Sequence, residues 1–180
     1  MSMPSNGSAY ARLCDEDTER DLLGCLLVDI ELRATVAKVV RIDDFSLLHH
    51  RLLYATIIGA GDAPFFDICH KLEDQPIFQE VGGEQYILDL MAFVENFAEG
   101  LHFAQRVAQL GQQRRVLRLA ESVAKAAIAG KLKGLSKAIA RGLRYALLSP
   151  TGLRSVGQQM PLPGLLPESQ EELASQPLNL

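Results

Sequence analysis

The chain of 180 residues lacks the marks of a membrane, secreted or zinc-binding protein. No apolar stretch approaches the roughly 18 residues that a membrane-spanning helix requires. The three cysteines, Cys14, Cys25 and Cys69, are widely spaced and form no C-x-x-C pair, which fits a reducing compartment and argues against a zinc finger. Residues 1–8 have none of the basic and apolar character of a signal peptide. We therefore expect a cytoplasmic protein.

The sequence also lacks motifs for nucleotide chemistry, catalysis or metal binding. No phosphate loop of the form G-x-x-x-x-G-K-[ST] occurs, and Gly82-Gly83 follows no predicted strand, so it indicates a turn. The adjacent His49 and His50 point about 100° apart on a helix and do not converge on one ion. The acidic clusters at 15–21 and 43–44 stand at predicted helix starts, where carboxylates meet the positive end of the helix dipole. We expect no enzyme activity, cofactor or metal.

Charge is sharply divided between the two halves of the chain. The overall net charge is −4, but residues 1–105 carry 7 basic and 18 acidic side chains. Residues 106–148 carry 10 basic side chains against Glu121 alone. A basic segment of this kind favours an acidic partner. Nucleic acid, another protein and the acidic first half of the chain all fit.

Short helical patterns fill residues 17–100. Apolar spacing predicts helices from Thr18, which we expect to be the cap, and over 31–40, 47–58, 67–72 (capped by Asp67) and 84–95. Glycine and proline mark the breaks between them, and strand signals are almost absent. We predict an all-α fold with a compact globule of about six short helices. The segments 1–16 and 149–180, rich in Ser, Gly and Pro, are predicted to be disordered.

Residues 101–148 predict a long αα-hairpin, with helices over 101–129 and 135–148 and a glycine-bounded turn at 130–134. A hairpin is too thin to bury both its apolar faces, so we expect self-association through apolar residues of both helices. These are Val116, Leu119, Val123, Leu135, Ile139, Leu143 and Leu147.

Basic residues of the same hairpin are candidates for docking a partner or DNA. They are Arg114, Arg115, Arg118, Lys133, Lys137, Arg141 and Arg144. A solvated outer helix face accounts for this pattern as well as an electrostatic patch does. Tyr145 is the only aromatic residue nearby, which gives little support to stacking of single-stranded bases. Of the two docking roles we favour a protein partner.

Several segments in the first half resemble one known family. They are Asp17-Thr18-Glu19-Arg20, the apolar run Leu22–Leu27, Asp44-Phe45, His50–Ile57, the Asp67…Leu72 pair and Val81-Gly82-Gly83-Glu84-Gln85-Tyr86-Ile87-Leu88-Asp89-Leu90. This series resembles the N-terminal domain of bacterial replicative DNA helicases of the DnaB type. The resemblance implies a helical globule followed by a hairpin. It also implies hairpins that pair between subunits, in a collar above an ATPase ring.

The resemblance and the missing phosphate loop together predict a non-catalytic DNA-replication module. We expect it to form homo-oligomers, a dimer or larger, through the hairpin and to bind primase, the replicative helicase, or both. The alternative is a basic-hairpin DNA-binding accessory protein of a mobile element. These hypotheses differ in their salt dependence, since phosphate contacts weaken steeply with salt whereas apolar pairing does not.

Overall fold

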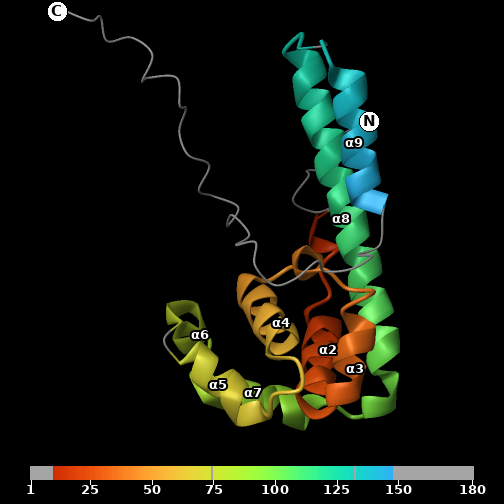
Figure 1. Cartoon of the computed structure of the whole chain (residues 1–180). Helices are drawn as coiled ribbons and strands as arrows, with labels where there is room; N and C mark the ends of the chain where they lie inside the picture. Colours follow the sequence, from red (N-terminus) through yellow and green to blue (C-terminus); the bar gives the residue numbers. More distant parts are fainter. Residues whose placement is uncertain (1–9, 74, 132, 148–180) are drawn as a thin grey trace, which may run out of the picture.

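The computed structural model describes residues 10–73, 75–131 and 133–147, and the prediction of a disordered 149–180 tail lies outside them. Figure 1 shows a cluster of short helices from which two antiparallel helices project. Within the described ranges no strand occurs, so the predicted all-α fold is confirmed. The elements are α2 (Glu16–Val28), α3 (Ile30–Val36), η1 (Ile42–Asp44), α4 (Leu48–Ala60), α5 (Phe65–Leu72), α6 (Pro76–Glu80), α7 (Gly83–Phe93), η2 (Phe97–Glu99), α8 (Gly100–Ile128) and α9 (Leu135–Leu147).

The starts of α2 and α3 are set by aspartates that precede the predicted starts. The Thr18 cap prediction was wrong: Asp15 caps α2, and its carboxylate accepts the Thr18 backbone N–H at 3.3 Å. Asp29 caps α3 in the same way, accepting from the Leu32 N–H at 3.0 Å. A short side chain just before the first turn satisfies a backbone donor that the helix itself leaves free. Asp67 lies inside the first turn of α5 rather than at its cap.

Helix α3 ends at Val36, four residues before the predicted boundary. The Val40 N–H still bonds the Val36 carbonyl at 2.8 Å, in a tight turn that leads to η1. At the other end of the globule, Gly82 and Gly83 take φ values of 118° and 60°. Only glycine adopts such angles without strain, which explains why the turn before α7 carries this pair.

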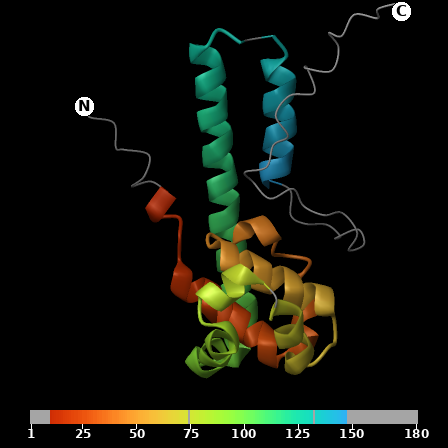
Figure 2. The same ribbon diagram turned by 90° about the vertical axis from the view of Figure 1, so that its left-hand side faces the viewer.

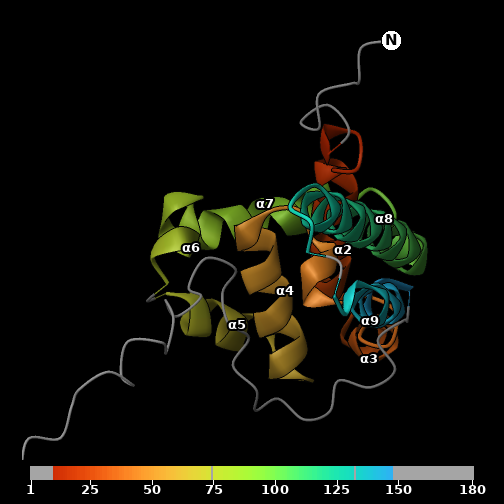
Figure 3. The ribbon, with the colours of Figure 1, turned by 90° about the horizontal axis from the view of Figure 1, so that it is seen from above.

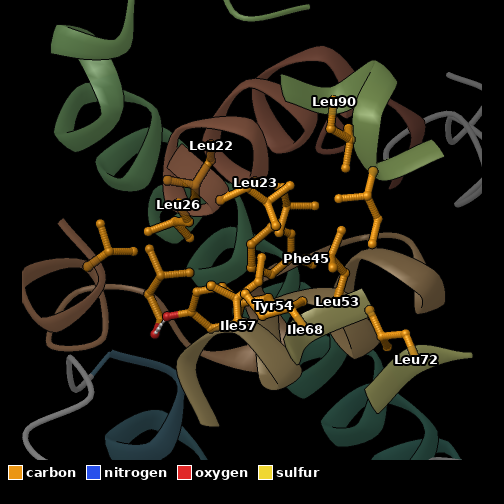
Figure 4. Close-up of a cluster of buried hydrophobic side chains, with 14 of the residues drawn as sticks. Leu22, Leu23, Leu26, Phe45, Leu53, Tyr54, Ile57, Ile68, Leu72 and Leu90 are labelled. Atoms are coloured by element: carbon orange, nitrogen blue, oxygen red, sulfur yellow. Dashed lines mark hydrogen bonds between the residues drawn. The ribbon is translucent and has the colours of Figure 1, made fainter. Parts of the chain in front are cut away.

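The core of the globule forms where α2, α4, α5 and α7 meet. Figure 4 shows Leu22, Leu23 and Leu26 of α2 pointing toward Tyr54 and Ile57 of α4, all of them fully buried. The Tyr54 hydroxyl donates to the Val40 carbonyl at 2.9 Å, so its polar end is satisfied inside the core. Helix α2 also approaches α7 closely, since a Cβ at Gly24 would overlap the Leu90 carbonyl.

The hairpin begins inside the globule and leaves it. The 29 residues of α8 span roughly 43 Å at the usual rise of a helix. Ala104, Val107 and Leu110 are buried near its start, and the second half runs beyond the globule beside α9 (Figure 2). Viewed from above, the two helices stand over the α2–α3 side, away from α5 and α6 (Figure 3).

Part of the N-terminal segment predicted to be disordered lies against α8. The Tyr10 hydroxyl donates to Glu121 Oε2 at 3.0 Å. The Leu13 carbonyl accepts a bond from Arg114 Nη1. Among the first 16 residues, those from Tyr10 onward are therefore placed by contacts with the long helix, which corrects that part of the prediction.

Candidate interaction surfaces of the helical hairpin

A buried ionic cluster joins the hairpin to the globule. Asp44 of η1 is 1% exposed, and its carboxylate forms an ion pair with Arg115 Nη1. The second carboxylate oxygen accepts the Arg41 backbone N–H at 2.8 Å. Arg114, also buried, donates to the Asp44 carbonyl. Asp44 thus bonds two cations of α8 that follow it by 70 and 71 positions, which fixes where the hairpin leaves the globule. Glu19 lies 3.9 Å from Arg114, and Asp43 lies 3.7 Å from Arg115.

A small residue makes this approach possible. At Gly111, one helical turn before Arg115, a Cβ would overlap the carboxylate, Cβ and Cα of Asp44. Gly111 lies in the interior of a long helix, where glycine costs about 1 kcal/mol relative to alanine. Here it allows η1 to lie against α8 closely enough for the ion pair to form.

At the solvent-facing edge of the same junction, α9 is bonded to Asp43 of η1 and to Arg41. The Tyr145 hydroxyl donates to Asp43 Oδ2 at 2.9 Å, and the Arg41 guanidinium lies 4.0 Å from the centroid of the Tyr145 ring. Arg41 also pairs with Asp43 at 3.0 Å and donates to the Tyr145 carbonyl at 3.2 Å. Burial and the nearby Asp43 carboxylate raise the pKa of Tyr145 above its usual value. The neutral phenol is therefore stabilised in place.

A second buried polar group lies inside the globule. His50 is fully buried, with Nδ1 2.8 Å from Glu19 Oε2 and Nε2 2.6 Å from the Tyr86 hydroxyl. Glu19 also accepts the Ser46 backbone N–H at 2.6 Å. Burial alone would raise the pKa of Glu19, but the bonds from His50 and Ser46 outweigh it and the net pKa is lowered. This arrangement connects α2, α4 and α7 and is structural in character.

The prediction that Arg114 and Arg115 dock a partner was wrong. They are 2% and 8% exposed, and their guanidinium groups bond to Asp44 and to backbone carbonyls of the same chain. Helical spacing could have predicted their burial, because both arginines continue the stripe of buried residues that begins at Ala104 and Val107. The other predicted docking residues, Arg118, Lys133, Lys137, Arg141 and Arg144, are all exposed.

Four of the seven predicted self-association residues face the other helix of the hairpin itself: Leu119, Val123, Leu135 and Ile139. Leu119 packs on Gly142, where a Cβ would come within 2.6 Å of Leu119 Cδ1, and Arg115 Nε donates to the Ala146 carbonyl at 3.4 Å. Helical spacing places the half-buried Val123, Leu135 and Ile139 on the same two contact stripes. The stripes are Arg115, Leu119, Val123 and Ala126 on α8, and Leu135, Ile139, Gly142 and Ala146 on α9.

One side of the hairpin is apolar and exposed. Each residue that follows a contact residue is turned by about 100°, and in two antiparallel right-handed helices this turn points to the same side. We name this the apolar side: Val116, Ala120, Ala124, Ala127, Ala140, Leu143 and Leu147, all exposed, with the polar Ser136 at the start of α9. Among them Val116, Leu143 and Leu147 are 37%, 43% and 50% exposed. These three remain available for the predicted self-association.

The residues that precede the contact stripes form the opposite side. Arg118, Ser122 and Lys125 lie there on α8, and Ala138, Arg141 and Tyr145 on α9. Lys137 and Arg144 point away from α8, at the outer edge of α9. The hairpin therefore has an apolar side and a basic side. The residue spacing along each helix considered alone does not show this division.

Neither a metal centre nor a membrane helix is found in the described part of the chain. No group of three His, Cys, Asp or Glu side chains there is placed to hold a metal ion. No helix among those residues is long and apolar enough to cross a membrane.

Comparisons with known proteins give one consistent result. The family model described as the DnaB-like helicase N terminal domain matches residues 11–109. The curated "Replicative DNA helicase DnaC" of Bacillus subtilis (strain 168) is 24% identical over 112 residues, which cover 60% of this chain and 25% of that protein. The solved N-terminal domain of DnaB helicase from Mycobacterium tuberculosis superposes with a TM-score of 0.67 at 21% identity, over 74% of this chain and 97% of that one.

Proposed function

Since the chain belongs to the DnaB-like helicase N terminal domain family, we propose that it is a non-catalytic assembly module of DNA replication. In this proposal it self-associates through its hairpin and binds primase, the replicative helicase, or both. The chain spans about a quarter of the length of the curated helicase that it matches. The activity of that longer protein is therefore not carried over.

The apolar side of the hairpin is the observation that supports self-association most directly. Seven apolar side chains line one side of two packed helices and are left open by the rest of the described chain. Isolated exposed apolar residues are common on protein surfaces, whereas a contiguous apolar side usually marks an interface. A second copy that presents the same side would form an isologous pair, the commonest symmetry of soluble homo-oligomers.

The absence of a phosphate loop from these 180 residues supports the non-catalytic part of the proposal. We expect the purified chain to hydrolyse no ATP and to separate no DNA strands. ATP turnover that co-purifies with the chain and disappears when one of its own residues is changed would contradict this.

Partner binding is tested with the primase and the replicative helicase of the organism that encodes the chain. Each is passed over the immobilised chain, and binding is followed by interferometry with unrelated proteins of similar size and charge as controls. We expect saturable binding to at least one of the two. Failure of both to bind, with the chain folded and oligomeric, would refute the assignment to replication assembly but not the self-association.

A further inference from the structure

The charged side chains on the projecting part of the hairpin are almost all basic. Between residues 118 and 147, outside the undescribed Leu132, seven basic side chains are exposed: Arg118, Lys125, Lys131, Lys133, Lys137, Arg141 and Arg144. The one acidic residue of this stretch is Glu121, which is half-buried and accepts the Tyr10 hydroxyl. Within the described residues none of the seven takes part in an ion pair. Their charge is left for a ligand outside the fold.

Five of these residues form one surface. Arg118, Lys125 and Arg141 lie on the side opposite the apolar side, and Lys137 and Arg144 continue it around the outer edge of α9. Lys137 and Arg144 are seven residues apart, roughly 10 Å along the helix, as are Arg118 and Lys125. We call this five-residue set the basic surface. It extends over two helices rather than around one point, so it fits an extended anion better than a single small one.

The residues between the charges decide the class of ligand. Ser122 and Ala138 are small. The aromatic side chains that lie beside these charges are both held within the fold, Tyr145 by Asp43 and Arg41 and Tyr10 by Glu121. A protein interface draws its affinity from buried aromatic and apolar anchors, with charges mainly at the rim. The basic surface offers no such anchor. Contacts with a phosphate backbone need only Lys and Arg.

The same composition separates duplex from single-stranded nucleic acid. Single strands are held by aromatic side chains on which bases stack, and no free aromatic ring lies on this surface. A duplex keeps its bases inside and presents about one negative charge per 1.7 Å of axis. We propose that the basic surface of the hairpin binds the phosphate backbone of duplex DNA without reading its sequence.

This site does not depend on the proposed assembly function. Arg118, Lys125 and Arg141 lie on the opposite side of the hairpin from the residues left for self-association, and Lys137 and Arg144 lie at the outer edge of α9. A second copy and a duplex can therefore be bound together. The acidic globule, with 18 Asp and Glu in residues 1–105, repels DNA and orients the duplex toward the hairpin.

The experiment measures fluorescence anisotropy of a labelled 30-base-pair duplex of random sequence, titrated with the full chain. A 30-nucleotide single strand is titrated in parallel, and both are measured at 50 and 200 mM salt. Three to five phosphate contacts predict a duplex affinity that falls roughly 40- to 500-fold between these salt concentrations. The single strand should bind more weakly than the duplex at both.

Two variants with the same change in net charge test whether duplex binding depends on the basic surface. In the hairpin variant, Lys125, Lys137, Arg141 and Arg144 are changed to Gln. In the control variant, four exposed basic residues outside the projecting hairpin are changed to Gln: Arg12, Lys38, Lys71 and Arg106. Each variant lowers the net charge of the chain by four. Circular dichroism and light scattering establish that both fold and associate as the wild type does.

We expect the hairpin variant to lose more than tenfold in duplex affinity and most of the salt dependence. The control variant should stay within about threefold of the wild type. No duplex binding at 50 mM salt, equal losses in both variants, or tighter binding of the single strand would each overturn the proposal. So would loss of self-association in the hairpin variant with duplex binding unchanged, which would assign the basic surface to an acidic face of a second copy.

Discussion

Asp44→Asn tests whether the buried ionic cluster holds the hairpin on the globule. The change keeps the shape of the side chain and removes the charge that faces Arg115. Asp44 is 1% exposed and Arg115 is 8% exposed, so water cannot replace the lost partner, and Arg115 keeps only the longer contact with Asp43 at 3.7 Å. Burial outweighs the bonds from Arg41 and Arg115 and raises the pKa of Asp44, so the cost of the change comes from leaving the buried Arg115 without this partner. Breaking a buried ion pair by removing one partner costs about 3–5 kcal/mol. With an urea dependence of about 2 kcal/mol per molar, the unfolding midpoint should fall by about 1.5–2.5 M.

Asp43→Asn is the matched control for this measurement. Asp43 is the neighbouring residue, and its half-buried side chain pairs with Arg41 at 3.0 Å and lies 3.7 Å from Arg115. Partly solvated pairs contribute about 1 kcal/mol or less, so the midpoint should move by at most about 0.5 M. Both midpoints are measured by circular dichroism at 222 nm. If Asp44→Asn shifts the midpoint no further than Asp43→Asn does, the cluster does not stabilise the junction as described.

Two further experiments test the close approach of α8 to Asp44 and the contribution of the buried Glu19. Gly111→Ala would place a Cβ on Asp44 and should lower the free energy of unfolding by about 1–3 kcal/mol. Gly59→Ala meets nothing within 4 Å and should raise the free energy of unfolding by about 0.5–1 kcal/mol. If thermal unfolding shows that both changes shift the stability in the same direction, the reasoning is wrong. Because the pKa of Glu19 is lowered in the fold, its stabilising contribution is present above its unfolded pKa and is lost as pH falls through the folded value. The stability difference between wild type and Glu19→Gln should therefore be constant from pH 7 to about 5 and shrink below about 4.5, and a difference that grows toward low pH in urea titrations would rule this out.

Much of the fold could be predicted from apolar spacing and glycine. The long helix was predicted as 101–129 and is Gly100–Ile128, and the second was predicted to start at Leu135, where it does start. Both boundaries follow from two stretches of continuous helical periodicity that a glycine-containing turn separates. The caps were harder, because Asp15, three residues before Thr18, and Asp29, two residues before the predicted start at Glu31, are the side chains that accept the free backbone N–H groups.

The candidate surfaces could be predicted only in part. Periodicity shows that a helix has an apolar face but not which partner covers it, so Leu119 and Leu143 were assigned to one seam although only Leu119 faces the other helix. Likewise Arg115 and Arg118 have the same charge and stand three residues apart. One is buried because Asp44 lies beside it, and that contact joins residues 71 positions apart. No local pattern records a contact of that kind.

Self-association through the apolar side is tested most directly by sedimentation velocity over a concentration series from about 1 to 100 μM. Leu143→Asp places a charge on the apolar side, and Ala138→Asp places the same charge on the opposite side of the same helix. Removing a charge from water into an apolar interface is strongly unfavourable unless it is paired. We predict that the wild type and Ala138→Asp sediment as a dimer or larger oligomer, while Leu143→Asp sediments as a folded monomer. A wild type that stays monomeric across the series, or an Ala138→Asp variant that dissociates as fully as Leu143→Asp, would contradict the assignment of this side as the assembly surface.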